Sequence, residues 1–157
     1  MTDTARPSKL DKIRQILVWV GVANQLFVTR LNRAIAGANL PFAQFVMLNH
    51  FNNFQNEGWT VTRLAKAFET GQPGVSKTVA RLVEKGYLRS EPDPVDGRSK
   101  LHHLTIAGAV AHAEALQRVA PDAELVFRDW DDNDIDQLHA LIFKLKSWLD
   151  ENRKTQA

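Results

Sequence analysis

Apolar residues recur at steps of three, four and seven along the first part of the chain. From about Ser8 to Ala36 this spacing predicts one long helix, whose middle, at residues 17–22, is apolar on nearly all sides. Because such a helix has to bury more than one face, we expect it to pack against its own fold and against a second chain. Gly37 and Asn39 are suited to end it, since both residue types tolerate the left-handed conformation of a helix end.

A second helical pattern starts at Pro41, a residue type favoured in the first turn of a helix, and should end near Glu57–Gly58. Its apolar residues keep the helical spacing and are mainly aromatic: Phe42, Phe45, Val46, Leu48, Phe51 and Phe54. The spacing alone explains them as core residues, which we prefer to an aromatic cage around a ligand.

Residues 60–105 predict two short helices followed by two strands. Thr60 or Thr62 can cap the third helix, and Glu69–Gly71 forms a turn. The fourth helix should begin near Gly71 or Gln72, run to about Lys85, and end at Gly86. Four residues form its inward apolar stripe: Val75, Val79, Leu82 and Val83.

The outward face of this fourth helix is short, polar and basic. It consists of Gln72, Gly74, Ser76, Lys77, Ala80 and Arg81. Small side chains let a helix enter the major groove of DNA, while Gln, Ser, Lys and Arg bond to base edges and phosphates. A helix N-terminus also favours phosphate. An ordinary solvated face with two cations explains the helix equally well.

A β-hairpin should follow, with strands at Tyr87–Glu91 and Arg98–Leu104. The connecting residues, 92–97, are rich in Pro, Asp and Gly, as expected for a turn. The alternative is a plain surface hairpin whose charges keep its edges soluble. However, the chain predicts little other sheet for this hairpin to join.

The predicted hairpin tip presents Arg98, with Lys100 as a second cation. Asp93 and Asp96 are placed to orient Arg98 by charge-assisted hydrogen bonds. An arginine held at a hairpin tip suits a narrow minor groove, where the negative potential of DNA is strongest. We therefore interpret these residues as a candidate DNA-binding tip.

Residues 106–153 predict two more helices. Thr105 can cap the first, which Pro121 should kink or interrupt before a restart at residues 122–124. Asp131 or Asp132 can cap the last. The last helix has a broad apolar face: Ile135, Leu138, Leu141, Ile142, Leu145, Trp148 and Leu149. On a lone subunit this face would remain half-covered.

Composition narrows the function classes. The 157 residues suit one domain with a sizeable core, and the absence of cysteine excludes disulfides and thiolate metal sites and fits a cytoplasmic protein. The net charge of +2 is uneven, because residues 1–59 and 60–105 each carry +3 while residues 106–157 carry −4. A positive excess in the first two segments is compatible with a phosphate-facing surface.

Several other functions find little support in the sequence. Residues 16–23 are apolar and follow three cations, but they lack a clear cleavage site, so a buried helix is preferred to a signal peptide. No P-loop, dinucleotide-binding or nucleophile-elbow motif occurs, and we expect neither an enzyme nor a cofactor. His102 and His103 point to opposite faces of a strand, so they do not predict a zinc site.

The segments LAKAF, VSKTVARLVEKGYL, DPVDGRSKLHHLT and IAG together resemble the winged helix–turn–helix of the MarR family of bacterial transcription regulators. The wing motif is highly specific, and a looser resemblance extends over nearly the whole chain, including LPFAQFVML. Pro73–Gly74 departs from the family, in which polar residues are more common at these positions.

This resemblance implies a mainly α-helical fold with a small hairpin wing, formed by one domain over residues 1–157. Residues 60–105 would be the DNA-binding lobe, and residues 8–36 and 106–153 the dimerisation helices. The fourth helix would enter the major groove and Arg98 the minor groove. The protein would then be a homodimer bound to a pseudo-palindromic operator, with repression as the expected mode of action and activation as the alternative. The alternative is a winged-helix protein-interaction module that does not bind DNA.

The resemblance also implies a small, often aromatic effector between the dimer helices and the DNA-binding lobe. Trp19, Phe27, Phe45 and His50 are candidates to line such a crevice, and each is equally well explained as core. Peroxide sensing through cysteine, which occurs in the family, is not open to this chain.

Overall fold

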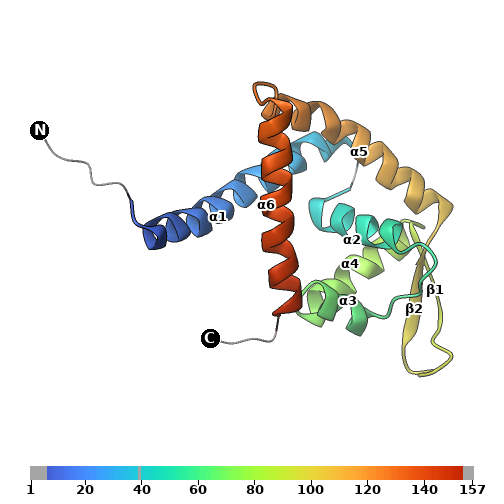
Figure 1. Ribbon diagram of the computed structural model, residues 1–157. Coiled ribbons are helices and arrows are strands. Elements are labelled where there is room, and N and C mark those ends of the chain that lie inside the picture. The colour runs from blue at the N-terminus through green and yellow to red at the C-terminus, as the bar shows by residue number, and fades with distance from the viewer. Residues whose placement is uncertain (1–6, 39, 154–157) are drawn as a thin grey trace, which may run out of the picture. The chain divides into compact units, whose positions relative to one another are not determined.

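The structure, a computed structural model, describes residues 7–38 and 40–153, most of them helical (Figure 1). Its elements are α1 (Lys9–Ala34), the 3₁₀ turn η1 (Ala36–Ala38), α2 (Phe42–Asn53), α3 (Val61–Ala67), α4 (Gln72–Glu84), β1 (Leu88–Pro92), β2 (Lys100–Leu104), α5 (Ile106–Val126) and α6 (Asp132–Glu151). The predicted fold class, helices with a two-stranded hairpin, is confirmed. Two compact units are present, one through Asp122 and one from Ala123 onwards.

Side chains cap the starts of several helices, including two of those for which a cap was predicted. Ser8 forms a capping box with Asp11, in which each side chain accepts a backbone N–H of the other residue at 3.2 Å. The Thr60 hydroxyl accepts from the backbone of Arg63 at 3.2 Å, which decides between Thr60 and Thr62. Asp131 caps α6 by accepting from the Asp134 backbone at 2.8 Å. Asn39, predicted to help end the first helix, lies outside the described residues.

The prediction that the second helix reaches Glu57–Gly58 is wrong, because α2 ends at Asn53. Phe54 leaves the helical conformation, with φ −125° and ψ 47°. Its ring then packs against His50 and Trp59, with centroids 4.9 and 5.5 Å away. Phe54 remains 43% exposed, so its ring contacts with His50 and Trp59, rather than full burial, accompany the earlier end of the helix.

The predicted interruption at Pro121 is also absent, since α5 is continuous from Ile106 to Val126. A proline removes one backbone donor, and the rest of this 21-residue helix keeps its own bonds. Asp122, expected in a restarted turn, instead receives two hydrogen bonds from the guanidinium of Arg30, at 2.6 and 2.9 Å. This bidentate pair joins α1 to α5.

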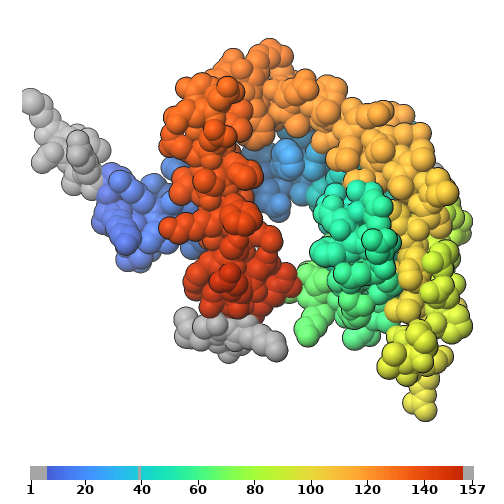
Figure 2. Space-filling model, turned by 45° about the vertical axis from the view of Figure 1, so that its right-hand side comes forward, coloured from blue at the N-terminus to red at the C-terminus, as the bar shows by residue number. Residues whose placement is uncertain are grey.

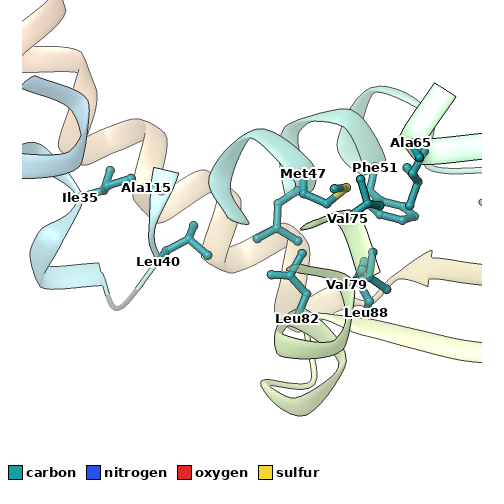
Figure 3. Packing of buried hydrophobic residues seen from close by; sticks show 12 residues of the cluster. Ile35, Leu40, Met47, Phe51, Ala65, Val75, Val79, Leu82, Leu88 and Ala115 are labelled. Carbon is teal, nitrogen blue, oxygen red and sulfur yellow. The ribbon is translucent and has the colours of Figure 1, made fainter. Parts of the chain in front are cut away.

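The core of the first unit lies where α2, α3, α4 and β1 meet (Figure 3). Leu48, Leu64 and Leu82 are completely buried. The predicted inward stripe of α4 is confirmed, because Val75 and Val79 are also buried and Val83 is half-buried. Phe45, Phe51 and Phe54 all make ring contacts, but only Phe51 of these three is fully buried.

The hairpin pairs β1 with β2 antiparallel, from Leu88 opposite Leu104 to Pro92 opposite Lys100. Trp59 adds an isolated bridge to His102, with backbone N–H donors on both sides at 3.0 and 2.9 Å. The base of the hairpin is thereby tied to the segment just before α3. Its tip stands clear of the helices of this unit (Figures 1 and 2).

Two helices expose broad apolar surfaces. In α1 only Leu31 is buried, while Leu17 and Trp19 are each 63% exposed. In the second unit no residue of α6 is buried, and Leu141 is 65% exposed. Among the described residues, no helix is long and apolar enough to cross a membrane.

Candidate nucleic-acid interface

The outward face of α4 is solvent-exposed in the structure. Its predicted residues Gln72, Gly74, Ser76, Lys77 and Arg81 are all exposed. Gly71 occupies the N-cap position and offers no side-chain bond, so the first-turn amides of α4 have no side-chain cap. A helix N-terminus carries partial positive charge, which favours phosphate. Pro73 has no backbone N–H and the Gly74 N–H donates to the Gly71 carbonyl at 3.2 Å, so the dipole rather than a set of free amides is what this end offers.

The two cations of α4 differ in their surroundings. The guanidinium of Arg81 lies 2.8 Å from a carboxylate oxygen of Glu84, and both side chains are more than half exposed. Exposed pairs of this kind contribute about 0.2–1 kcal/mol, so a phosphate can displace Glu84 at small cost. Lys77 makes no ion pair within the described part of the chain.

Asp93 organises the backbone of the hairpin tip. One of its carboxylate oxygens accepts from the Val95 backbone at 2.9 Å, and the other accepts from the Ser99 hydroxyl at 3.0 Å. The bond from Val95 is the main cause that lowers the pKa of Asp93, and the bond from Ser99 adds to it. The Asp93 backbone N–H also donates to the Ser99 carbonyl at 3.1 Å. The tip is therefore closed around this carboxylate.

Asp96 acts on the same turn through different atoms. Its carboxylate accepts from the backbone N–H of Arg98 at 3.1 Å, and its carbonyl accepts from the Ser99 backbone at 2.9 Å. The charge-assisted bonds predicted from Asp93 and Asp96 to the Arg98 side chain are not formed. Both carboxylates hold backbone instead, and the exposed guanidinium of Arg98 has no ion-pair partner among the described residues.

A cleft of about 670 Å³ lies between α4 and the hairpin. The predicted residues Ser76, Arg98 and Lys100 all line it. Lys77, Arg81 and Gln72 lie elsewhere on the exposed face of α4, and Gly74 borders a separate groove between α2 and α4. The cleft thus brings Ser76 of α4 together with Arg98 and Lys100 of the hairpin, and it does not include the two α4 cations.

Two histidines at the hairpin base have different partners. His102 is buried, and its Nδ1 lies 2.9 Å from the Ser90 hydroxyl, while His103 Nε2 lies 2.9 Å from Glu91. Burial is the main cause that lowers the pKa of His102. No group of three or more His, Asp or Glu side chains is arranged to hold a metal ion within the described residues.

The four candidate effector residues are distributed over different surroundings. Trp19 and Phe27 are exposed on α1, by 63% and 39%. Phe45 stacks on His112 at 5.5 Å. His50 lies among Phe54, Trp59 and Phe68, where burial is the main cause that lowers its pKa. Phe45 and His50 therefore contact different rings rather than each other.

Sequence reasoning missed the residues that tie the hairpin to α3. The Arg63 guanidinium lies 4.3 Å above the Trp59 ring, donates to the Gly58 carbonyl at 2.9 Å, and pairs with Glu57 at 3.1 Å. The only sign of this contact in the sequence is that Trp59 and Arg63 lie on either side of the helix cap Thr60. Ser99 was also missed, because its role depends on the folded turn.

A family model described as "MarR family" matches residues 38–99, which contain α2, α3, α4 and most of the hairpin. The matched segment is similar to this family over the second, third and fourth helices and the hairpin as far as Ser99. No curated protein matches the chain significantly.

Several solved structures have the same fold as this chain. A cysteine-to-serine mutant of MarR from E. coli, complexed with operator DNA, is 23% identical with a TM-score of 0.72, covering 88% of this chain and 99% of that one. Apo wild-type MarR from E. coli is 24% identical with a TM-score of 0.71, covering 80% and 92%. The regulator BldR from Sulfolobus solfataricus is 20% identical with a TM-score of 0.75, covering 90% and 99%.

Proposed function

We propose that the protein is a homodimeric repressor that binds a pseudo-palindromic operator and is released by a small ligand. The observation that carries this proposal is the concave surface between α4 and the hairpin, lined by Ser76, Arg98 and Lys100. Each subunit would supply one such surface to one half-site of the operator.

In this proposal α4 enters the major groove. Gln72 and Ser76 offer hydrogen-bonding groups to base edges, and Gly74 lets the backbone come close. A Cβ atom at Gly74 would meet nothing within 4 Å of the protein, so the space there is available to a ligand such as DNA. Lys77 and Arg81 would contact phosphates, which position the helix without reading sequence.

The hairpin is proposed to lie along the adjacent minor groove. Asp93 and Asp96 hold the turn through its backbone, which leaves the Arg98 guanidinium exposed and without a carboxylate partner in the described chain. A narrow minor groove concentrates negative potential and attracts such an arginine. Lys100, opposite Pro92 in the hairpin, would contact the flanking backbone.

A second copy of the chain is the proposed partner of the exposed helices. The apolar faces of α1 and α6 are uncovered in the described residues, as expected for surfaces that a dimer buries. Two recognition helices related by a two-fold axis would lie about 34–36 Å apart, one turn of DNA. A ligand that prefers dimers with a different spacing would lower operator affinity by shifting the population.

The experiment that tests this proposal is selection of bound sequences from random duplex DNA. We expect enrichment of a site with two inverted half-sites, whose centres are about 10–10.5 base pairs apart. Binding should also weaken steeply with salt, because Lys and Arg contacts release counterions. A dimer that enriches no sequence and shows no salt-dependent binding to duplex DNA would instead favour a protein-interaction module.

A further inference from the structure

One hydroxyl group connects the start of α5 to the end of α4. The Thr105 hydroxyl donates to the Gly86 carbonyl at 2.7 Å, with the Tyr87 carbonyl also near at 3.1 Å. The same oxygen accepts from the backbone N–H of Gly108 at 3.0 Å and so caps α5. The Thr105 backbone N–H adds a bond to the Tyr87 carbonyl at 3.1 Å.

The acceptors of these bonds lie where α4 passes into the hairpin. Gly86 adopts φ +73°, which ends the helix, and the Tyr87 N–H donates back to the Leu82 carbonyl at 2.9 Å. Leu88, the next residue, starts β1 opposite Leu104. Bonds to Gly86 and Tyr87 therefore fix the last turn of α4 and the base of the hairpin together.

Gly108 is needed for α5 to approach this junction. A Cβ atom at position 108 would lie 2.2 Å from the Tyr87 carbonyl oxygen and 2.9 Å from Leu104 Cδ1. The first of these neighbours is backbone, which cannot rotate away. Gly108 is itself buried inside a regular helix, so it is required for its lack of a side chain rather than for an unusual φ.

We propose that Thr105 and Gly108 are positioning residues for DNA recognition, an inference that rests on the proposed function. They touch no DNA in this proposal. They hold α4 and the hairpin at one separation. At this separation α4 can contact the major groove while Arg98 contacts the minor groove. Loss of either residue displaces one reading element relative to the other.

Thr105 tests this inference through a matched pair of variants. Thr105→Val keeps the shape but removes the hydroxyl, whereas Thr105→Ser keeps the hydroxyl. Against the duplex recovered by selection, we expect Thr105→Val to weaken binding roughly tenfold, within the range for removal of one base contact. Thr105→Ser should stay within about twofold of the wild type, because it retains both hydrogen bonds.

Gly108→Ala tests the close approach, with Ala107→Gly as its control. Alanine is the better helix former, so helix propensity alone predicts that Gly108→Ala stabilises the protein. We expect the reverse, with a lower melting temperature and weaker operator binding. Ala107 is exposed in the same turn, and Ala107→Gly should lower stability without changing operator affinity.

The ratio of operator affinity to affinity for unrelated duplex DNA separates positioning from simple loss of stability. Displaced reading elements lower this ratio, because non-specific binding depends on charge alone. If Thr105→Val and Gly108→Ala, measured as folded dimers, keep the wild-type ratio, the positioning role is overturned. If the wild type binds no duplex DNA at all, the proposed function is overturned, and the positioning role is overturned with it.

Discussion

At the scale of single residues, the wing shows how two carboxylates can serve a cation without touching it. Asp93 and Asp96 accept backbone N–H groups and the Ser99 hydroxyl, and this closes the turn that carries Arg98. A guanidinium paired with a carboxylate would have to give up that pair before meeting DNA. The observed arrangement orders the backbone and keeps the charge available.

We expect Arg98→Ala to weaken operator binding by about 1–3 kcal/mol, the scale of one good base contact. The measurement is a titration of operator DNA at fixed salt concentration. Arg128→Ala removes the same charge from an exposed position in the second unit and should have a much smaller effect. Equal affinities for Arg98→Ala and the wild type would refute the assignment of Arg98 to the minor groove.

Two buried histidines and one half-buried histidine should make the fold less stable in mild acid. Burial is the main cause that lowers the pKa of His50, His102 and His112 below the ordinary value of 6.5. The unfolded chain then binds protons more readily, so stability is fully present above about pH 6.5 and is lost as pH falls through the lower folded pKa values. Urea unfolding at pH 7.5 and 5.0 measures this loss.

His112 offers a specific check, because its Nε2 bonds to Asn49 Oδ1 at 3.1 Å and links α5 to α2. Gln retains a hydrogen-bonding group but has no titrating proton. His112→Gln should therefore show a smaller shift of the urea midpoint between the two pH values than the wild type. An unchanged shift would exclude His112 as a contributor.

At the scale of elements, α4 packs against the core with one side and exposes its polar residues on the opposite side. Val75, Val79 and Leu82 bury one side against the core, and the polar residues on the other side remain exposed. The packed side fixes the orientation of the helix, and thereby decides which residues can face DNA. This division follows directly from the 3.6-residue period.

The double variant Lys77→Ala/Arg81→Ala tests the phosphate role of α4. If both cations bind phosphate in each subunit, the slope of log affinity against log salt should decrease by about 0.9 for each phosphate no longer neutralised. Sequence preference should persist, because phosphate contacts position the helix and base contacts specify the site. A wild-type slope would refute the phosphate role, whatever the change in affinity at one salt concentration.

The elements could largely be predicted from the sequence, since caps such as Thr60 and Asp131 and the stripe of α4 are local signals. The end of α2 could not, because the Phe54 ring packs on Trp59, a contact that depends on the folded chain. Continuity through Pro121 was missed for a similar reason. The loss of one backbone hydrogen-bond donor at Pro121 is small beside the other interactions of this long helix, which include the pair between Arg30 and Asp122.

The candidate site could be predicted only where it depends on local sequence patterns. The exposed residues of α4 follow from helix periodicity, and the tip of the hairpin follows from its turn residues. The bonds of Thr105 to Gly86 and Tyr87 join segments 18 and 19 residues apart, so no local pattern contains them. The space requirement at Gly108 likewise appears only once Tyr87 and Leu104 lie against the start of α5.

At the scale of the whole molecule, the exposed apolar surface is the main feature that a single chain leaves unexplained. In the second unit a cleft of about 630 Å³ is lined mainly by apolar side chains, including Phe127, Ile142 and Phe143. Leu17 and Trp19 of α1 are as exposed as Leu141 of α6. Surfaces of this kind are costly in water and normally mark an interface.

A charge on the apolar face of α6 should therefore disrupt the dimer. Leu141→Glu places a carboxylate where the second subunit would exclude water, and burial of an unpaired charge costs several kcal/mol. We expect the variant to sediment as a monomer at concentrations where the wild type is a dimer. Operator affinity should fall with it, because one subunit reads only one half-site.

Ala140→Glu is the matched control for this change. It adds the same charge at an exposed neighbouring position outside the predicted apolar face of α6, so it should leave sedimentation and operator affinity near those of the wild type. A monomeric Leu141→Glu variant that keeps full operator affinity would show that dimerisation is not needed for recognition. A dimeric Leu141→Glu variant would instead place the interface away from this face, and α1 would become the next helix to test.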